Sequence, residues 1–184
     1  MARPKGPPGQ ARQRVVDAAL ELFAEHGVGG TSLQMIADRL GVTKAAVYHQ
    51  FPAKDDIALA IVEPLFAAMT ALVEGAEAAS EEDRLGVVLR GLVAAILDQR
   101  QRFGTWSHDP EFGRLAREHP ENQVVVARLE NLLRGSDPTP RRLIAVTLFT
   151  SGVIGCAIAP NLVDIDDELM REELDRLATI LVGS

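Results

Sequence analysis

The sequence predicts an all-α protein with a small N-terminal helix-turn-helix domain and a larger C-terminal helical domain. Apolar residues recur at the three- and four-residue spacing of a helix along the chain, and strand-like alternation of apolar and polar residues is absent. Two glycine-containing breaks, "HGVGG" and Gly41, separate short segments near the N-terminus. The chain has 184 residues, 47% hydrophobic and 24% charged, which is the composition of a folded globular protein.

The first predicted helix lies in "RVVDAALELF" and ends at "HGVGG", where glycines supply a helix end and a turn. Its apolar side consists of Val15, Ala18, Ala19, Leu22 and Phe23. A second helix is expected in "TSLQMIADRL", because Thr31 followed three residues later by Gln34 has the arrangement of a capping box. The apolar face of that helix consists of Leu33, Ile36, Ala37 and Leu40.

A third short helix, "KAAVYHQF", is expected after Gly41, with Thr43 as its N-terminal cap. At helical spacing Val47 and Phe51 turn toward the core. The outward face then presents Lys44, Ala45, Tyr48 and His49. Two short helices joined by a glycine-containing turn form a helix-turn-helix.

The stretch from Ala18 to Ile57 resembles the DNA-binding domain of the TetR family of bacterial transcriptional regulators. The resemblance is carried by the "LF..HG" end of the first helix, Thr31–Ser32, "IA" at Ile36–Ala37, "GVT" at the turn, "VYHQF" in the third helix and Lys54 in a fourth. About forty residues of correctly spaced motif are more specific than one short pattern. The resemblance implies a flexible basic arm over residues 1–9, a helix-turn-helix DNA-binding domain over 10–56, and a ligand-binding and dimerisation domain over 57–184.

The resemblance identifies the third helix as a recognition helix for double-stranded DNA. A major groove admits an α-helix, and the small residues Ala45 and Ala46 let the helix backbone approach the duplex closely. The residues expected at the DNA are Thr31, Ser32, Thr43, Lys44, Ala45, Ala46, Tyr48, His49 and Lys54. From the helical pattern alone, a solvated surface helix explains the same outward face.

Lys54 and the N-terminal arm are two further indications of phosphate binding. A lysine in the first turn of a helix lies against the positive end of the helix dipole, and a DNA phosphate relieves this; Asp55 and Asp56 also offset the dipole. The first sixteen residues carry four basic side chains and no acidic one. Such an arm suits contact with phosphates or the minor groove, and a solubilising tail is the alternative.

The charge of the chain is unevenly distributed. The formal net charge is −7, yet residues 1–60 carry seven basic and six acidic side chains, so the negative charge lies in the remainder. The single cysteine, Cys156, excludes an intramolecular disulfide and a multi-cysteine zinc site. The N-terminus also lacks the apolar core of a secretory signal. These features predict a cytoplasmic protein.

Beyond residue 60 every segment has a helical pattern. Ser80 is placed to cap "SEEDRLGVVLRGLVAAILDQR", and "PENQVVVARLENLLRG" has Pro120 near its start and Gly135 past its end. The run from Leu143 to Ala159 has seventeen residues without a charge, fewer than the roughly 20 of a membrane span, so a buried helix is expected and no membrane.

A final amphipathic helix is expected in "DDELMREELDRLATILV". The resemblance implies that this helix and the uncharged one before it form a four-helix interface in a homodimer. Small residues in the uncharged run, among them Gly152 and Gly155, allow close approach of helices. The core of a monomer is the alternative explanation for both helices.

Large apolar or amphipathic side chains in the C-terminal part are candidates for a ligand cavity. They lie in segments that correspond to the family's pocket helices: Phe66, Met69, Phe103, Trp106, His108, Phe112 and Phe149. Packing in a core explains each of them singly equally well. His108, Asp109 and Glu111 lie on an irregular proline-containing segment without a second cluster, so neither a metal nor another cofactor is expected.

These observations predict a homodimeric, ligand-responsive DNA-binding regulator, a repressor released from a palindromic operator by a mainly apolar small-molecule effector. An enzyme is not expected, because no Ser/His/Asp arrangement, catalytic carboxylate pair or phosphate loop stands out. The alternatives are an all-helical enzyme or ligand carrier that retains the N-terminal fold, and a non-specific architectural DNA-binding protein. The acidic C-terminal part fits the architectural role poorly.

Overall fold

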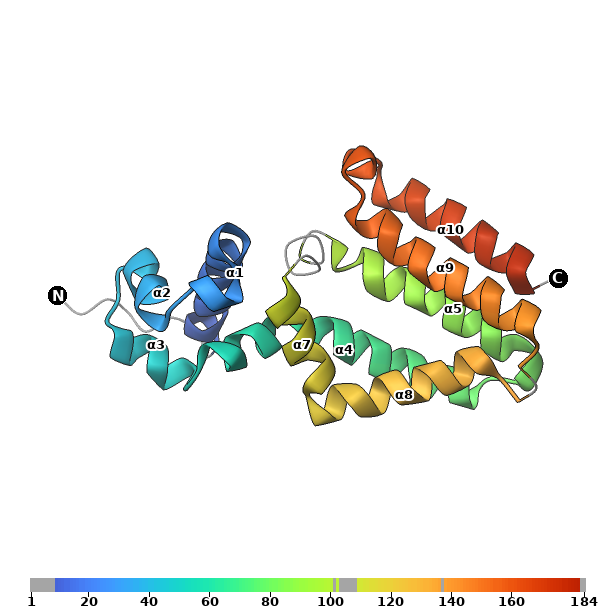
Figure 1. The fold of residues 1–184 in the computed structure, drawn as a ribbon, viewed down its shortest axis with the longest axis horizontal. Coiled ribbons are helices and arrows are strands. Elements are labelled where there is room, and N and C mark those ends of the chain that lie inside the picture. The colour runs from blue at the N-terminus through green and yellow to red at the C-terminus, as the bar shows by residue number, and fades with distance from the viewer. Residues whose placement is uncertain (1–8, 101, 103–108, 137, 183–184) are drawn as a thin grey trace. The chain divides into compact units, whose positions relative to one another are not determined.

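A computed structural model describes residues 9–100, 102, 109–136 and 138–182. These residues form α-helices and one short 3-10 helix, with no strand among them, which confirms the all-α fold class (Figure 1). They group into two compact units. The N-terminal unit contains the described residues up to Glu63 and residues 109–117, and the C-terminal unit contains the others.

The N-terminal unit is a helix-turn-helix completed by a segment from later in the chain. Its helices are α1 (Gln10–Gly30), α2 (Leu33–Leu40), α3 (Lys44–Gln50), the first part of α4 (Lys54–Ala78) and most of α7 (Pro110–Glu118). Helix α1 is kinked at Gly27, whose φ of 72° suits glycine. The core side chains include Val15, Ala19, Leu22, Phe23, Ile36, Val47, Phe51, Ile57, Ile61 and Phe112.

The caps of α2 and α3 follow the sequence with one correction. Thr43 caps α3 as predicted, its side chain accepting the N–H of Ala46 at 3.2 Å. The predicted capping position, Thr31, is wrong by one residue, because Ser32 caps α2 and accepts the N–H of Met35. Thr31 is buried, and its hydroxyl donates instead to backbone carbonyls near the end of α1.

The C-terminal unit is a bundle arranged around α5. It contains most of α4, α5 (Glu81–Leu97), α8 (Pro120–Arg134), α9 (Pro140–Ile158), the 3-10 helix η1 (Pro160–Leu162) and α10 (Asp167–Val182). Helix α5 packs against α8, α9 and α10. The predicted cap of α5 is confirmed, since Ser80 accepts the N–H of Asp83. Pro120 begins α8 and Gly135 ends it with a φ of 73°, as the sequence predicts.

Helix α9 is less buried than its uncharged sequence predicts. Only Phe149, Val153 and Ala157 are buried along it. Four of its other apolar residues are exposed: Leu143, Ile144, Leu148 and Ile154. By length and composition alone, α4 and α9 pass the test for a membrane span, which helices of soluble proteins also pass. Helix α9 therefore has one face packed in the unit and a second apolar face left open.

Candidate nucleic-acid interface

Helix α3 has the predicted division into an inner and an outer face. Val47 and Phe51 are buried, which fixes the rotation of the helix. The outer face consists of Lys44, Ala45, Ala46, Tyr48 and His49, all exposed. Tyr48 keeps 58% of its surface accessible, which is a large exposed fraction for an aromatic side chain. The orientation is confirmed, and DNA contact by these residues remains a prediction.

The position of α3 depends on how α2 is fixed to α1. The turn between α2 and α3 is made by Gly41, whose φ of 66° lies in the left-handed region. Arg39 on α2 donates to Glu21 at 2.8 Å and to Glu25 at 3.0 Å, both on α1. The hydrogen bonds that Arg39 donates to Glu25, and then those to Glu21, raise the pKa of its guanidinium. This guanidinium fixes α2 on α1, and its charge is locally balanced rather than presented to a phosphate.

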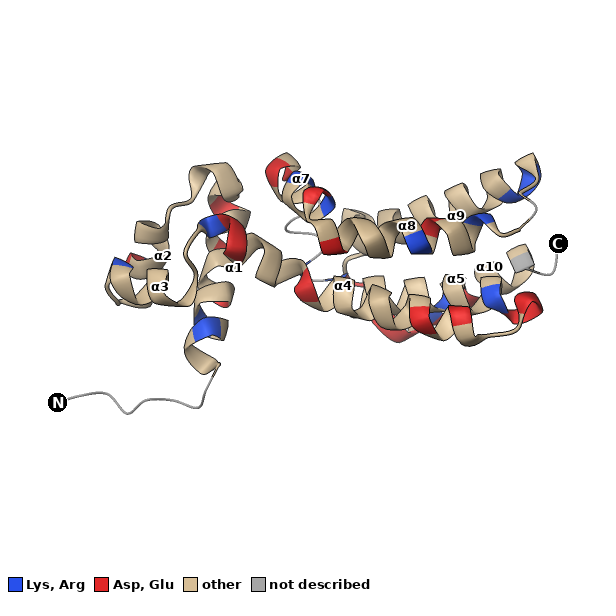
Figure 2. Cartoon of the chain, turned by 90° about the horizontal axis from the view of Figure 1, so that it is seen from below, with Lys and Arg blue, Asp and Glu red and all other residues tan. Residues whose placement is uncertain are grey.

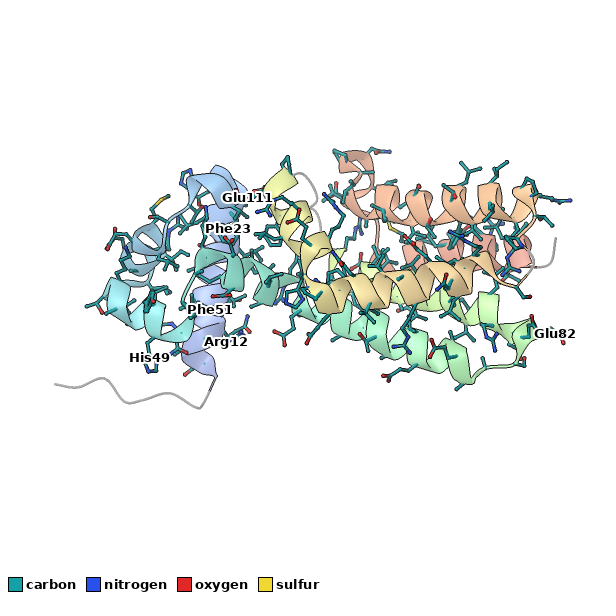
Figure 3. All side chains as sticks on the ribbon, turned by 60° about the horizontal axis from the view of Figure 1, so that its bottom comes forward. Arg12, Phe23, His49, Phe51, Glu82 and Glu111 are labelled. Atoms are coloured by element: carbon teal, nitrogen blue, oxygen red, sulfur yellow. The ribbon has the colours of Figure 1, made fainter. Side chains whose placement is uncertain are left out.

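Arg12 and Arg14 lie in the first two turns of α1 and not in a flexible arm, because the helix begins at Gln10. The guanidinium of Arg12 stacks on the Phe51 ring, 4.3 Å from its centroid (Figure 3). Arg14 is exposed and borders a hollow of about 140 Å³ that Ala46 and Gln50 also line. Arg12 and Arg14, which were predicted to belong to the arm, are thus two cations beside α3. Recognising that α1 begins at Gln10, directly after Gly9, would have placed both arginines on the helix.

The serine and the two threonines predicted at the DNA have structural roles. Ser32 and Thr43 are exposed caps, so the same side chains that begin α2 and α3 also lie at the surface. Thr31 is only 3% exposed, and its hydroxyl donates to Gly27 O at 2.8 Å and to Leu22 O at 3.2 Å. The structure therefore argues against a direct DNA contact by Thr31, because its polar atom is used inside the unit.

Lys54 has a partner that the sequence did not reveal. Its Nζ atom donates to Val28 O at 2.7 Å and to Gly29 O at 3.3 Å, at the end of α1. The start of α4 is stabilised separately, because Asp56 accepts the N–H of Ala53 at 2.9 Å. Lys54 as a whole is half-buried, and its ammonium group donates to these carbonyl oxygens. Phosphate binding by Lys54 remains a prediction that competes with this contact.

The predicted ligand-binding residues that the structure describes belong to different units. Phe103, Trp106 and His108 lie outside the described residues. Phe66 and Met69 lie on α4, half-buried and buried respectively. Two residues are placed elsewhere: Phe112 packs edge-on against Phe23 in the N-terminal unit, with ring centroids 5.9 Å apart, and Phe149 lines a groove beside α10. Within the described residues, no group of three His, Cys, Asp or Glu side chains is arranged to hold a metal ion.

An apolar groove lies between α9 and α10 in the C-terminal unit. It has a volume of about 740 Å³ and is lined by Arg141, Ile144, Ala145, Leu148, Phe149, Leu177, Ile180 and Leu181. Ile144 and Leu148 are 61% and 69% exposed. Charged residues of α9 are confined to its first turn, as Figure 2 shows. We define the α9–α10 face as this groove together with the exposed glycines Gly152 and Gly155. Neighbouring exposed apolar side chains of this kind are typical of interaction sites.

The helix-turn-helix region is similar to a known protein family. Residues 15–61 match the family model described as bacterial regulatory proteins, tetR family. The crystal structure of AmtR from Mycobacterium smegmatis has a similar fold, with a TM-score of 0.70 and 25% sequence identity, over 99% of this chain and 90% of that one. The likeness therefore extends through both units.

Two curated relatives illustrate the extent of the sequence similarity. The transcriptional regulator TtgR of Pseudomonas putida is 31% identical over 97 residues, 50% of this chain and 46% of the relative. The transcriptional repressor AcnR of Corynebacterium efficiens is 30% identical over 114 residues, 62% and 55% of the two chains. The matched region thus spans about half of these curated relatives.

Proposed function

The chain belongs to the TetR family of bacterial regulatory proteins, and from this premise we propose that it is a sequence-specific DNA-binding transcriptional regulator, acting as a repressor in the cytoplasm. The observation that carries the proposal is the outer face of α3. That face combines a lysine, a tyrosine and a histidine with two alanines, on a helix whose rotation is fixed by Val47 and Phe51. Such a face has long polar groups for base edges and phosphates and no bulk that would keep the helix out of a major groove.

Selection from random DNA tests the proposed function. The purified protein is expected to enrich an approximately palindromic site, whose two half-sites are separated by about one helical turn or slightly more, as two symmetry-related recognition helices require. Equal affinity for enriched and random duplexes at physiological salt would rule out sequence-specific regulation. The same result would leave a non-specific architectural role standing.

Two substitutions on α3 are expected to weaken specific binding without unfolding the helix. Lys44→Ala removes a cation, so we expect lower affinity and a shallower dependence on salt, by about one unit of slope for each phosphate that is no longer neutralised. Tyr48→Phe removes only the hydroxyl of an exposed ring. Electrophoretic mobility shifts at several salt concentrations measure both effects, and circular dichroism checks the fold. Wild-type binding by both variants would exclude this face as the DNA contact.

The α9–α10 face supports a homodimer, the second part of the proposal. Its exposed apolar side chains and its two glycines without side-chain bulk suit close packing against helices of a second copy. A palindromic site requires two recognition helices, so dimerisation and operator recognition belong together. The oligomeric state in solution tests this part directly.

The third part of the proposal is release from DNA by a mainly apolar small molecule bound in the C-terminal unit. Its support is the apolar character of α4, on which Phe66 is half-buried and Met69 is buried in the C-terminal unit. An effector shifts the equilibrium only by its differential affinity for the two states. Trp106 is the single tryptophan, so ligand titrations followed by its emission provide the assay. We expect an effector to change both the emission and operator affinity, and a broad screen without any such compound would contradict sensing.

A further inference from the structure

A single residue at the end of α1, Val28, is held from two sides by charged side chains. Its N–H donates to Asp109 Oδ2 at 2.6 Å, and its carbonyl accepts from Lys54 Nζ at 2.7 Å. Asp109 is 81 residues away in the sequence, and Val28 itself is fully buried. Hydrogen bonds to ionised groups are stronger than neutral ones, so the two contacts fix this turn firmly.

The two glycines beside Val28 leave room for this attachment. A Cβ atom at Gly27 would lie 3.2 Å from Asp109 Oδ2, and one at Gly29 would lie 2.9 Å from Glu111 Oε2. Gly27 also has a φ of 72°, a backbone angle that residues other than glycine rarely adopt. The sequence "HGVGG", which predicts a helix end, therefore also forms the surface that receives α7. Figure 3 shows Glu111 and Phe23 at this contact.

The two carboxylate oxygens of Asp109 have two separate roles, because each accepts hydrogen bonds from a different helix end. Its Oδ1 accepts the N–H groups of Glu111 at 2.8 Å and Phe112 at 3.2 Å, which caps the start of α7. Its Oδ2 accepts the N–H of Val28. The first task concerns α7 alone, whereas the second joins α7 to α1. A carboxylate is needed for both together, because an amide side chain has only one acceptor oxygen.

The turn held by Asp109 leads directly into the helix-turn-helix. Thr31 bridges back to it, through its N–H to Val28 O at 3.3 Å and its hydroxyl to Gly27 O. The next residue, Ser32, caps α2, and α2 carries α3. Helix α4 continues from this unit into the C-terminal unit, and α7 ends where the C-terminal unit resumes in the sequence. Lys54, the first residue of α4, and Asp109, which immediately precedes α7, supply the two groups that bind Val28.

We propose that Asp109 is a positioning residue for DNA recognition, which holds the end of α1, and through it α2 and α3, in the orientation that fits the operator. The proposal rests on the proposed DNA-binding function and deepens it. Without the Oδ2 hydrogen bond, the turn at Val28 adopts more than one arrangement. Operator affinity then falls in proportion to the fraction of molecules that keep the competent one.

The decisive variant is Asp109→Asn, which separates the two tasks. Asparagine caps helices well and keeps one acceptor for α7, but its NH₂ group cannot accept the N–H of Val28. We expect operator affinity to fall about tenfold, close to the decrease in Asp109→Ala. We also expect faster hydrogen exchange in the peptide that contains Val28. If Asp109 acted only as the cap of α7, the asparagine variant would bind like the wild type.

Asp166→Asn is the matched control, because Asp166 Oδ1 caps α10 in the same way, accepting the N–H groups of Glu168 at 3.0 Å and Leu169 at 3.2 Å. This control is expected to leave operator affinity and exchange at Val28 unchanged. The proposal is overturned if Asp109→Asn binds the selected site within twofold of the wild type, or if exchange at Val28 does not change. Failure of the wild type to select any site would instead remove the proposed function, and the exchange measurement would still report on the hydrogen bond.

Discussion

Replacing Gly152 by arginine is expected to give a folded monomer whose operator affinity is lower by about 100-fold or more. Gly152 is exposed on the α9–α10 face, and apart from its chain neighbours and the adjacent backbone of its own helix, no described atom lies within 4 Å of the position of an added Cβ. Within one protomer the change costs nothing in packing, and arginine favours a helix over glycine by about 1 kcal/mol. In a dimer, a long cation would have to fit between closely packed helices. Analytical ultracentrifugation and operator titrations measure the two outcomes.

Gly75→Arg is the matched control for this substitution. Gly75 is also an exposed helical glycine with open space around its Cβ position, but it lies on α4, outside the α9–α10 face. The control should remain dimeric and bind the operator like the wild type. A Gly152→Arg protein that sediments with the wild type would show that the interface lies elsewhere.

The apolar residues of the α9–α10 face supply energy on the scale that a dimer requires. The most exposed of them, Ile144, Leu148, Leu177 and Ile180, retain between 44% and 69% of their surface. Burying roughly half of each side chain in both protomers contributes on the order of 10 kcal/mol. The loss of translational and rotational freedom on association costs about 4–15 kcal/mol. Because these terms are comparable, one buried unpaired charge at the centre is enough to prevent association.

Much of the fold could be predicted because its signals are local. The caps Thr43 and Ser80 and the stop at Gly135 are found where the sequence indicated them, since each acts on backbone groups within three or four residues. The inward turn of Val47 and Phe51 follows from helical spacing. The one-residue error at Thr31 arose because both Thr31 and Ser32 are good caps, and only the tertiary fold directs the threonine hydroxyl to the carbonyls of α1.

The parts that could not be predicted depend on contacts between distant segments. Lys54 was expected at a phosphate because of its place in the first turn of α4, and its carbonyl partners on α1 lie 25 and 26 residues earlier. Phe112 was expected in a ligand cavity because it is large and apolar and lies in a segment that corresponds to the pocket helices of the family it resembles. Its partner Phe23 belongs to the other end of the sequence. Composition and periodicity carry no information about such pairings.

Phe112→Ala is expected to destabilise the N-terminal unit by about 3–5 kcal/mol, the usual cost of truncating a fully buried phenylalanine. Phe112 is 1% exposed, although it lies more than fifty residues beyond the helix-turn-helix motif, and its ring packs edge-on against Phe23 of α1. The truncation leaves a cavity beside α1 and removes the aromatic pair, which contributes about 0.5–1.5 kcal/mol beyond burial. Urea denaturation measures the decrease in the free energy of unfolding, and hydrogen exchange shows which helices are destabilised.

The positions of the amides that lose protection from hydrogen exchange distinguish this prediction from a general loss of stability. Exchange should accelerate in α1 around Phe23, while the amides of α5 and α10 in the C-terminal unit keep their protection, because stability is distributed over separate cooperative regions. Val124→Ala serves as the control, since Val124 lies on α8 with 60% of its surface exposed and should cost no more than about 0.5 kcal/mol. A destabilisation below about 1 kcal/mol for Phe112→Ala, with α1 still protected, would mean that α7 is not part of the core that supports the recognition helix.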